Sequence, residues 1–386
     1  MSEIENLRSH IDEIDRELVA LFEKRMETVL KIAEYKKNND LEIFNQAREV
    51  EVIEKNISRL KNKKFQESTT NFLNKVMEIS KEVQKEYVNI DSCDEEACST
   101  LENQNYGIRK YPLSLRVGYQ GEPGSFSEEA LTQYFGDKVS TYNVMDFQDI
   151  FEALKNHRID YGVLPIENSS TGGISEVYDL LRKYGFYIVG ERCIKVEHNL
   201  VGPKGTKLED ITEVYSHPQA FQQCSEFFKD YRDLRLIPFK NTAISAKYIN
   251  EEKCKEKAAI CSGKAAELYD LDIIKGNINY NVINHTRFII IGRDLEVNKD
   301  CNKVSIVTTT AHQPGALYEI LGFFAENNLN MIKIESRPII DRSWEYFFYI
   351  DINGNFHDET VRKSIKAIKE NSSYFKLLGN YVGHRI

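Results

Sequence analysis

Charged and amide side chains interrupt the apolar stripes of three helical patterns in the first part of the chain. Arg25 and Lys36 fall on a stripe whose apolar residues advance by alternating steps of three and four, which is the spacing of a helix packed against other helices. Glu49 heads a second stripe, and Ser80 and Gln84 continue a third. A lone Arg on such a stripe more often extends its charge into solvent. Because buried charges are costly unless they are paired, the recurrence on three stripes predicts an interior pocket for a small polyanion.

Four apolar stretches in the middle of the chain end in clusters of polar residues. They are GYQGEPGSFSEEA (118–130), GVLPIENSSTGGI (162–174), YSHPQAFQQC (215–224) and FKNTAISA (239–246). Capping explains a single cluster, because Ser and Thr favour helix starts, but it does not readily explain four. Since α/β sheets bind ligands at the ends of their strands, these clusters predict a binding site.

The segment NHTRFIIIG (284–292) places Thr286 and Arg287 at the start of a short apolar run. In the simpler interpretation, Thr286 suits a strand and Arg287 is a solvated cation at its end. In the functional interpretation, a hydroxyl donor and a cation are held rigidly at a sheet edge. The residues alone leave both interpretations open.

The elements that would position these residues fall into three successive patterns. Residues 1–88 are helical in pattern and contain no proline or glycine, and 89–113 begin with an acidic stretch typical of a solvated linker. Residues 114–295 alternate short strands with helical segments, which predicts an α/β layer architecture. Residues 300–386 read strand, helix, strand, strand, helix, strand, which is the order of a ferredoxin-like α+β unit. We therefore expect a helical domain, a linker, an α/β domain and a ferredoxin-like domain.

Composition excludes several classes of protein. The 386 residues carry a net charge of −9 and no dense basic block, which argues against a nucleic-acid partner. No apolar stretch reaches the length of a membrane span, and no secretory signal is recognisable. The seven cysteines form no CxxC pair and no Cys/His cluster at zinc spacing. We expect a cytoplasmic protein with reduced thiols, without a metal, a cofactor or a membrane association.

The helical part resembles the all-helical chorismate mutase family. The matching motifs are NLRSHID, EKRMETVLKIAEYK, QAREVE and EISKEVQ. In that family the pocket holds chorismate while it rearranges to prephenate, a reaction that needs only positioning and charge stabilisation. The resemblance implies that chorismate is bound by Arg8, Arg25, Lys36, Asn45, Arg48, Glu49, Ser80 and Gln84.

The resemblance also assigns roles within this pocket. Arg8 and Arg25 would grip carboxylates, Lys36 and Gln84 would donate to the ether oxygen, and Glu49 would hold the ring hydroxyl. Arg8 precedes Arg25 by 17 residues, or about 25 Å along one helix at roughly 1.5 Å per residue. Arg8 should therefore reach the pocket from a second subunit. The family often has Asp where this chain has Asn45, which leaves open a variant with a weak mutase.

The central phrases, with TRF as the most characteristic piece, resemble prephenate dehydratase over about 180 residues. The resemblance implies two α/β lobes around a cleft, as in periplasmic binding proteins, and removal of CO2 and the ring hydroxyl from prephenate to leave phenylpyruvate. Thr286 would give the departing hydroxyl a proton, which is plausible for a threonine only in a dry, preorganised cleft. His217 and His285 are alternative acids that the family does not favour. The implied prephenate-binding residues are Glu167, Asn168, Ser169, Ser216, Gln219, Gln223, Thr286 and Arg287.

The motifs QPGALYEIL and KIESRP resemble those of an ACT domain, an amino-acid-sensing module. The GAL turn opens a predicted helix, whose N–H groups suit a carboxylate. By resemblance the effector is L-phenylalanine, bound between paired ACT domains. A purely dimer-forming domain is the alternative. The implied phenylalanine-binding residues are Gly315, Ala316, Leu317, Glu335, Ser336, Arg337 and Pro338.

The order of the three parts resembles the bifunctional chorismate mutase/prephenate dehydratases over essentially the whole chain. That resemblance implies an enzyme with two active sites and one allosteric site, assembled as a homodimer or a dimer of dimers. Two alternatives stay open. One is a dehydratase that prefers arogenate, and the other is a non-catalytic amino-acid sensor, which would have no need of the proton donor in TRF.

Overall fold

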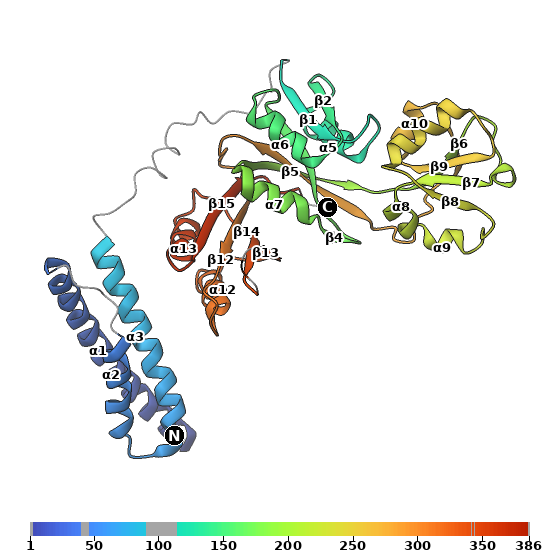
Figure 1. Ribbon diagram of the computed structural model, residues 1–386. Helices are drawn as coiled ribbons and strands as arrows, with labels where there is room; N and C mark the ends of the chain where they lie inside the picture. Colours follow the sequence, from blue (N-terminus) through green and yellow to red (C-terminus); the bar gives the residue numbers. More distant parts are fainter. Residues whose placement is uncertain (1–2, 40–45, 90–113, 341, 343, 385–386) are drawn as a thin grey trace. The chain divides into compact units, whose positions relative to one another are not determined.

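The computed structural model describes two compact units, Met1–Gln104 and Asn105–Ile386 (Figure 1). The described residues are 3–39, 46–89, 114–340, 342 and 344–384. Asn45 and residues 90–113 of the expected linker lie outside them.

The first unit consists of helices, as predicted. Its elements are α1 (Glu3–Asn38), α2 (Gln46–Ser58), the short 3-10 helix η1 (Lys63–Phe65) and α3 (Gln66–Asn89). Helix α3 packs against both α1 and α2. The contact between α1 and α3 buries Val29, Ala33, Val76 and Met77, so the core of this unit lies beside the second half of α1.

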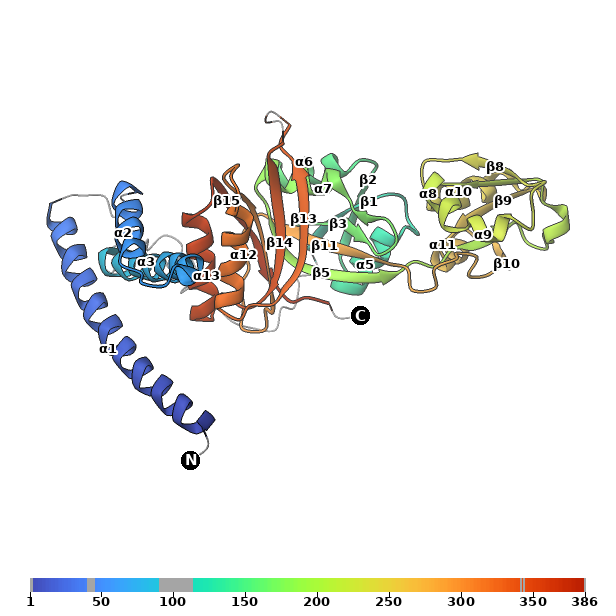
Figure 2. The same ribbon diagram turned by 90° about the horizontal axis from the view of Figure 1, so that it is seen from below.

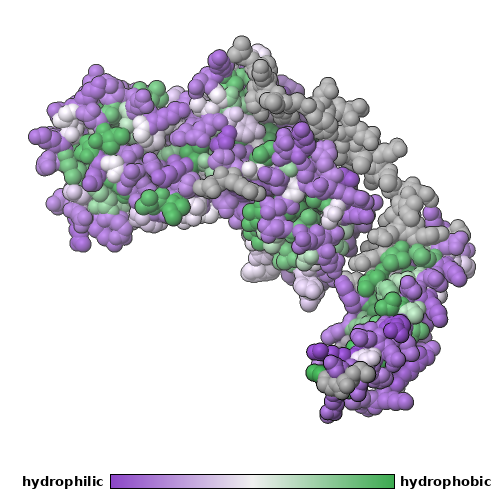
Figure 3. Space-filling model, turned by 180° about the vertical axis from the view of Figure 1, so that it is seen from behind, coloured by the Kyte–Doolittle hydropathy of each residue, from purple (hydrophilic) through white to green (hydrophobic). Residues whose placement is uncertain are grey.

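The first half of α1 keeps its apolar stripe exposed. Hydrophobic residues gather on the surface of this unit (Figure 3). Those of the stripe are 47–65% exposed, and they are Ile4, Leu7, Ile11, Ile14, Leu18 and Leu21. Within one chain, therefore, only the second half of α1 buries apolar residues against another helix.

The second unit contains two lobes, each built on its own sheet (Figure 1). The first lobe has the strand order β2-β1-β3-β11-β5, with the short β4 beside β3. Helix α5 covers one face, and α6 and α7 cover the other. The elements are β1 (Arg116–Gln120), α5 (Phe126–Phe135), β2 (Ser140–Val144), α6 (Phe147–Lys155), β3 (Tyr161–Asn168), β4 (Gly172–Gly173), α7 (Ser175–Tyr184), β5 (Tyr187–Lys195) and β11 (His285–Gly292).

The second lobe has the strand order β10-β6-β9-β7-β8. The chain enters it after β5 and returns through β11, so two crossing segments join the lobes. This is the two-lobed architecture that the resemblance implied. The elements are β6 (Asn199–Gly202), η2 (Leu208–Asp210), β7 (Glu213–Ser216), α8 (Pro218–Gln223), α9 (Ser225–Phe228), β8 (Arg235–Pro238), α10 (Thr242–Glu252), β9 (Lys257–Cys261), α11 (Gly263–Leu268) and β10 (Asp272–Lys275).

The C-terminal domain has the predicted ferredoxin-like order and forms a sheet β13-β14-β12-β15. Its two helices pack on one face of the sheet, and the other face packs on the first lobe, as Figure 2 shows. Val307, Tyr349 and Leu378 join the core that α6 and α7 also line. The elements are β12 (Lys303–Thr309), α12 (Ala316–Glu326), β13 (Met331–Pro338), β14 (Tyr346–Asn353), α13 (Glu359–Glu370) and β15 (Tyr374–Tyr381).

The sequence predicted seven strands between the linker and the C-terminal domain, at LRVGY, YGVLPIE, FYIVG, EVYSH, LRLIPF, AAICS and RFIIIG. All seven are present, but β2, the two-residue β4, β6 and β10 were missed. Strands β2 and β10 lie at sheet edges and are mostly exposed, so neither needs the apolar run that marks a buried strand. Strand β6 has only four residues. Two of the missed strands are therefore edge strands that are mostly exposed, whereas the edge strands β5 and β8 were predicted.

Strand β15 packs closely on β5 at Gly379. A Cβ atom at this position would overlap the main-chain carbonyl of Ile188. We expect Gly379→Ala to cost about 1–3 kcal/mol, as overpacking usually does, and to lower the unfolding midpoint of the full chain in calorimetry. The control is Gly322→Ala in α12, where a Cβ would meet no atom within 4 Å and the change should stabilise by up to about 1 kcal/mol. Equal midpoints for the two variants would contradict the close packing.

Candidate active sites

Three of the residues expected to hold chorismate meet between α1 and α3. Arg25 donates to the main-chain oxygen of Val76 at 3.3 Å and to the hydroxyl of Ser80. Gln84 donates to the main-chain oxygen of Ser80 at 3.3 Å, while its own Oε1 is buried and accepts no hydrogen bond from the described residues. Burial lowers the pKa of Arg25. Hydrogen bonds thus join Arg25, Ser80 and Gln84 between α1 and α3.

The structure describes the side chains of three other residues expected in this pocket. Arg8 is exposed on the first half of α1, and Lys36 is half-buried near the end of the same helix. Arg48 is exposed and pairs with Glu51 at 2.7 Å. Asn45 and the side chain of Glu49 lie outside the described part of the chain. Of these residues, Arg8 and Arg48 are therefore exposed within one chain.

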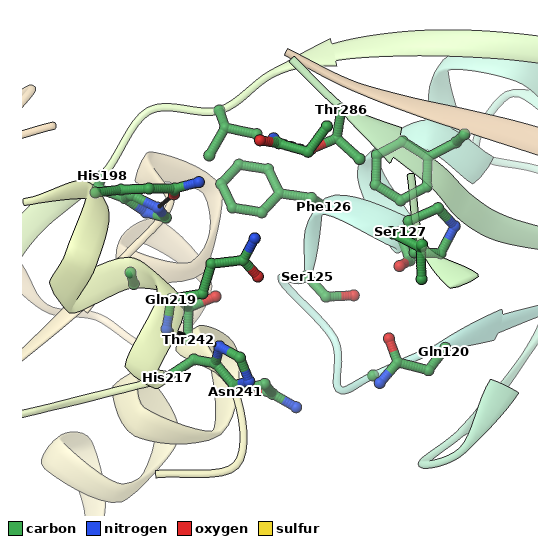
Figure 4. A pocket seen from close by; sticks show the side chains of 18 of the residues that line it. Gln120, Ser125, Phe126, Ser127, His198, His217, Gln219, Asn241, Thr242 and Thr286 are labelled. Atoms are coloured by element: carbon green, nitrogen blue, oxygen red, sulfur yellow. Dashed lines mark hydrogen bonds between the residues drawn. The ribbon is translucent and has the colours of Figure 1, made fainter. Parts of the chain in front are cut away.

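A polar cavity lies between the two lobes of the second unit (Figure 4). Its wall includes residues from each of the four segments 118–130, 162–174, 215–224 and 239–246, and from NHTRF (284–288). Figure 4 shows side chains of the second lobe facing those of the first across this space. The polar residues of the wall are Gln120, Ser125, Ser127, Asn168 and Thr286 from the first lobe, His217, Gln219, Gln223, Lys240, Asn241 and Thr242 from the second, and His198.

Thr286 is buried at this wall, and Asn168 fixes its hydroxyl. Asn168 Nδ2 donates to Thr286 Oγ1 at 2.9 Å and to Asn284 Oδ1 at 2.8 Å. Its Oδ1 accepts the main-chain N–H groups of Ser170 at 2.9 Å and Thr171 at 3.2 Å. Both ends of the Asn168 amide are thus occupied within the protein. Because Oγ1 already accepts one hydrogen bond, the Thr286 proton can be donated to another acceptor.

Two histidines of the cavity hold neighbouring glutamines. His198 Nε2 lies 2.7 Å from Gln223 Oε1, and since that oxygen can only accept, Nε2 carries the proton. His217 Nδ1 accepts the main-chain N–H of Gln219 at 3.2 Å. Burial lowers the pKa of both histidines, although the bond to Gln223 opposes the effect at His198. Both rings are therefore neutral at pH 7.

A hydrogen bond also links the two lobes across the cavity. Gln219 of the second lobe donates to Thr171 Oγ1 of the first lobe at 2.9 Å.

Four residues expected to bind prephenate do not line the cavity: Glu167, Ser169, Ser216 and Arg287. Ser216 is buried within its sheet and donates to a main-chain oxygen of β9 at 3.0 Å. Ser169 donates to the main chain of the crossing segment before β11 at 3.2 Å. Of the two histidines considered as acids, His217 lines the cavity and His285 does not.

Arg287 and Glu167 lie on the face of the sheet that contacts the C-terminal domain. Arg287 lies 3.0 Å from Glu167, 3.3 Å from Glu191 and 2.7 Å from Asp351, and Lys333 lies 2.9 Å from Glu167. Burial acts to lower the pKa of Arg287, but Asp351 and Glu191 hold it well above its usual value. Burial would likewise raise the pKa of Asp351, and Arg287 keeps it below its usual range. The resemblance allowed Arg287 either to meet a substrate carboxylate or to brace the site, and this geometry favours the bracing role.

The residues expected to bind the effector fall on two sides of the C-terminal domain. Gly315 and Leu317 line a cavity with Trp344, and Gly315 has a positive φ of 88° at the start of α12. Glu335 and Arg337 instead face the first lobe, where Arg337 lies 2.9 Å from Asp179. The remaining three are a buried Ala316 and exposed Ser336 and Pro338. The cavity that Gly315 and Leu317 line includes no residue of the ESRP motif.

Several residues of the dehydratase cavity were not singled out from the sequence. Gln120, Ser127, Lys240 and Asn241 lie inside the quoted phrases, so the signal was present but did not distinguish them from capping residues. His198 lies in the segment that crosses between the lobes, and no motif marked it.

Two negative findings apply to the described residues. They contain no group of three or more His, Cys, Asp or Glu side chains that could hold a metal ion. None of their helices combines the length and apolar character that crossing a bilayer would require.

Comparison with known proteins accounts for all three parts of the chain. Family models for chorismate mutase type II, prephenate dehydratase and the ACT domain match residues 7–85, 117–296 and 304–370, respectively. The bifunctional chorismate mutase/prephenate dehydratase of Buchnera aphidicola subsp. Schizaphis graminum is 31% identical over 388 residues, covering 99% of this chain and 97% of its own.

Two further relatives cover the second unit. Arogenate dehydratase/prephenate dehydratase 1 of Arabidopsis thaliana is 35% identical over 283 residues, or 69% of this chain and 72% of its own. The crystal structure of prephenate dehydratase from Arthrobacter aurescens in complex with L-Phe has a TM-score of 0.64 at 29% identity, and covers 69% of this chain and 90% of that one.

The helical unit, the cavity between two lobes and the C-terminal domain together define a multifunctional enzyme with an isomerase part, a lyase part and a regulatory part. The match along nearly the whole chain makes the class specific. The chain belongs to the bifunctional chorismate mutase/prephenate dehydratase family. Its two activities are those of a chorismate mutase and a prephenate dehydratase, joined to an ACT domain.

Proposed function

We propose that Thr286 donates the proton on which the dehydratase reaction depends. The observation that carries this role is the 2.9 Å bond from Asn168 to Thr286 Oγ1, which leaves the hydroxyl proton for the substrate. Loss of CO2 from prephenate releases an electron pair that drives out the ring hydroxyl and makes the ring aromatic. A proton from Thr286 lets that hydroxyl leave as water, and solvent then restores it, so one proton is consumed overall. Asn168 acts by orienting Thr286.

The polar cluster of the helical unit is the part of the mutase site that one chain provides. Arg25 would bind a carboxylate of chorismate, and Gln84 and Lys36 would stabilise charge on the ether oxygen as the C–O bond breaks. We propose that Arg8 comes from a second copy in a homodimer. The exposed apolar stripe on the first half of α1 supports this arrangement, because an apolar helix face is stable in water when another helix covers it.

We further propose that the mutase domain spans 1–88, the dehydratase domain 114–295 and the ACT domain 300–386, with 89–113 as the linker. The scattered cysteines fit a reducing compartment, and we propose the cytoplasm.

L-phenylalanine is the proposed feedback inhibitor, as the L-Phe complex of the Arthrobacter aurescens relative supports. Phenylalanine is one transamination beyond phenylpyruvate, so the effector would report the amount of end product. Its site would combine the GAL turn of one ACT domain with the ESRP strand of another. The cavity at the GAL turn includes no residue of the ESRP motif, which supports a site formed between paired domains. Its residues would be Gly315, Ala316, Leu317, Glu335, Ser336, Arg337 and Pro338.

The route from effector to active site would run through ion pairs. Lys333 on β13 lies 3.9 Å from Glu335 and 2.9 Å from Glu167. Glu167 pairs in turn with Arg287, which follows Thr286 in the chain. A ligand that displaces β13 would therefore disturb the residues directly behind the catalytic hydroxyl.

We expect Arg25→Ala to lower kcat/KM for chorismate by about a hundredfold or more, as loss of a preorganised charge donor commonly does. Dehydration of supplied prephenate should stay near the wild-type rate, because the two activities occupy separate domains. The control is Lys31→Ala, an exposed cation on the same helix. Separate assays with chorismate and prephenate measure this, and loss of both activities would refute the two-site account.

We expect Thr286→Ala to show the reverse pattern. Dehydratase turnover should fall by about 10²–10⁴-fold, the range typical of a general acid, while chorismate consumption is unchanged. Thr286→Ser, which keeps the hydroxyl, should recover much of the lost rate. If the alanine variant retained most of its dehydratase turnover, another group would have to supply the proton.

We expect Asp351→Asn to weaken inhibition without weakening phenylalanine binding. The amide keeps an acceptor for Ser305 but no longer pairs as an anion with Arg287. Lys333→Gln should act in the same direction, because it removes the cation that pairs with Glu167. Calorimetric binding of phenylalanine is compared with inhibition of the dehydratase, and exposed Asp358→Asn is the control. Full inhibition in both network variants would exclude this route.

A further inference from the structure

We propose that the cavity between the lobes selects a substrate with an α-keto side chain over the corresponding α-amino acid. This inference rests on the proposed dehydratase site. Prephenate carries a keto oxygen where arogenate carries an ammonium group, and the rest of the two molecules is the same. Four side chains of the cavity wall distinguish these two groups: Gln223, Asn241, His217 and Lys240.

Gln223 presents its amide donor to the cavity because His198 occupies its oxygen. His198 is buried and neutral, so its protonated Nε2 donates to Gln223 Oε1 at 2.7 Å. The ring packs edge-on against Phe126, with centroids 6.1 Å apart, which holds it in place. The NH2 group of Gln223 is then the end that remains for a ligand. A keto or carboxylate oxygen can accept from it, whereas an ammonium group cannot.

Asn241 and His217 are oriented in the same sense by the helices that they cap. Asn241 Oδ1 accepts the main-chain N–H of Ile244 at 2.7 Å at the start of α10, so its NH2 group remains for the cavity. His217 Nδ1 accepts a main-chain N–H at the start of α8, so its proton resides on Nε2. Lys240 precedes Asn241 and adds a full positive charge to the same wall.

No Asp or Glu is among the residues that line this cavity. Three acidic residues near the lining segments are engaged elsewhere. Glu122 lies 3.5 Å from Lys247, Glu197 lies 2.5 Å from Lys195, and Glu128 accepts the main-chain N–H of the 122–125 turn at 2.8 Å. An ammonium group in the cavity would thus meet Lys240 without a compensating carboxylate.

Gln120 and Gln219 act in the opposite sense, because each donates its amide within the protein, at 3.0 Å and 2.9 Å. Their carbonyl oxygens can accept from a ligand. A neutral oxygen, however, compensates a positive charge much less than a carboxylate does. The wall therefore offers one positive charge, three hydrogen-bond donors on the second lobe and two neutral acceptor oxygens. This combination favours a substrate whose side chain carries only hydrogen-bond acceptors. A site with oriented donors also rejects an analogue that leaves them unpaired, often by tenfold or far more.

The test measures kcat/KM of the full-length chain for prephenate and arogenate, in the wild type and in variants that add a carboxylate. Asn241→Asp keeps the helix cap, because Asp is as good a capping residue as Asn, and it puts a negative charge beside Lys240. Gln223→Glu does so at the second position. The matched control is Gln222→Glu, an exposed neighbour on the same helix.

We expect the wild type to prefer prephenate by about tenfold or more. Each carboxylate variant should shift the ratio towards arogenate by a similar factor, and the control should leave it unchanged. Lys240→Met gives the same direction by removing a cation, and it decides the case if the acidic variants lose both activities. A wild type that uses arogenate as well as prephenate, or a ratio that none of the three variants shifts, would overturn the inference. Absence of turnover with either substrate would instead overturn the dehydratase site itself.

Discussion

The pairing of β3 with β11 is the interaction on which the second unit depends. Thr286 lies opposite Asn168, and Arg287 lies opposite Glu167. Because successive side chains of a strand point to opposite faces, the first pair faces the cavity and the second faces the C-terminal domain. One short ladder therefore holds the proposed proton donor on one side and a buried ion pair on the other.

This back-to-back arrangement explains why a small-molecule sensor can be attached to a catalytic lobe without sharing its cavity. Arg287 is surrounded by Glu167, Glu191 and Asp351, and a buried cation of this kind is stable only while its anions stay in place. Movement of the ACT sheet must therefore be matched by movement of the strands that it touches. The helical unit differs, because the first half of α1 leaves its apolar stripe exposed within one chain.

The sequence predicted the parts of this structure that depend on local pattern. Apolar runs marked the central strands, and polar phrases at their ends marked the cavity wall. The side on which Arg287 lies could not be predicted, since it depends on the pleat, on the irregular register between Arg287 and Phe288, and on a domain that begins later in the chain. The orienting role of Asn168 depends on partners up to 118 residues away. The place of His198 in the cavity could not be predicted, because it depends on a contact with Gln223, which lies 25 residues later in the chain.

The pairing of β3 with β11 is proposed both to hold the hydroxyl of Thr286 and to respond to the effector. Hydrogen–deuterium exchange of the full-length chain, with and without L-phenylalanine, tests this proposal most directly. The account predicts that exchange changes in the ACT domain and also at 165–168 and 285–288, while β1 in the same sheet is unaffected. A change confined to the ACT domain, in protein whose dehydratase is fully inhibited, would contradict the account.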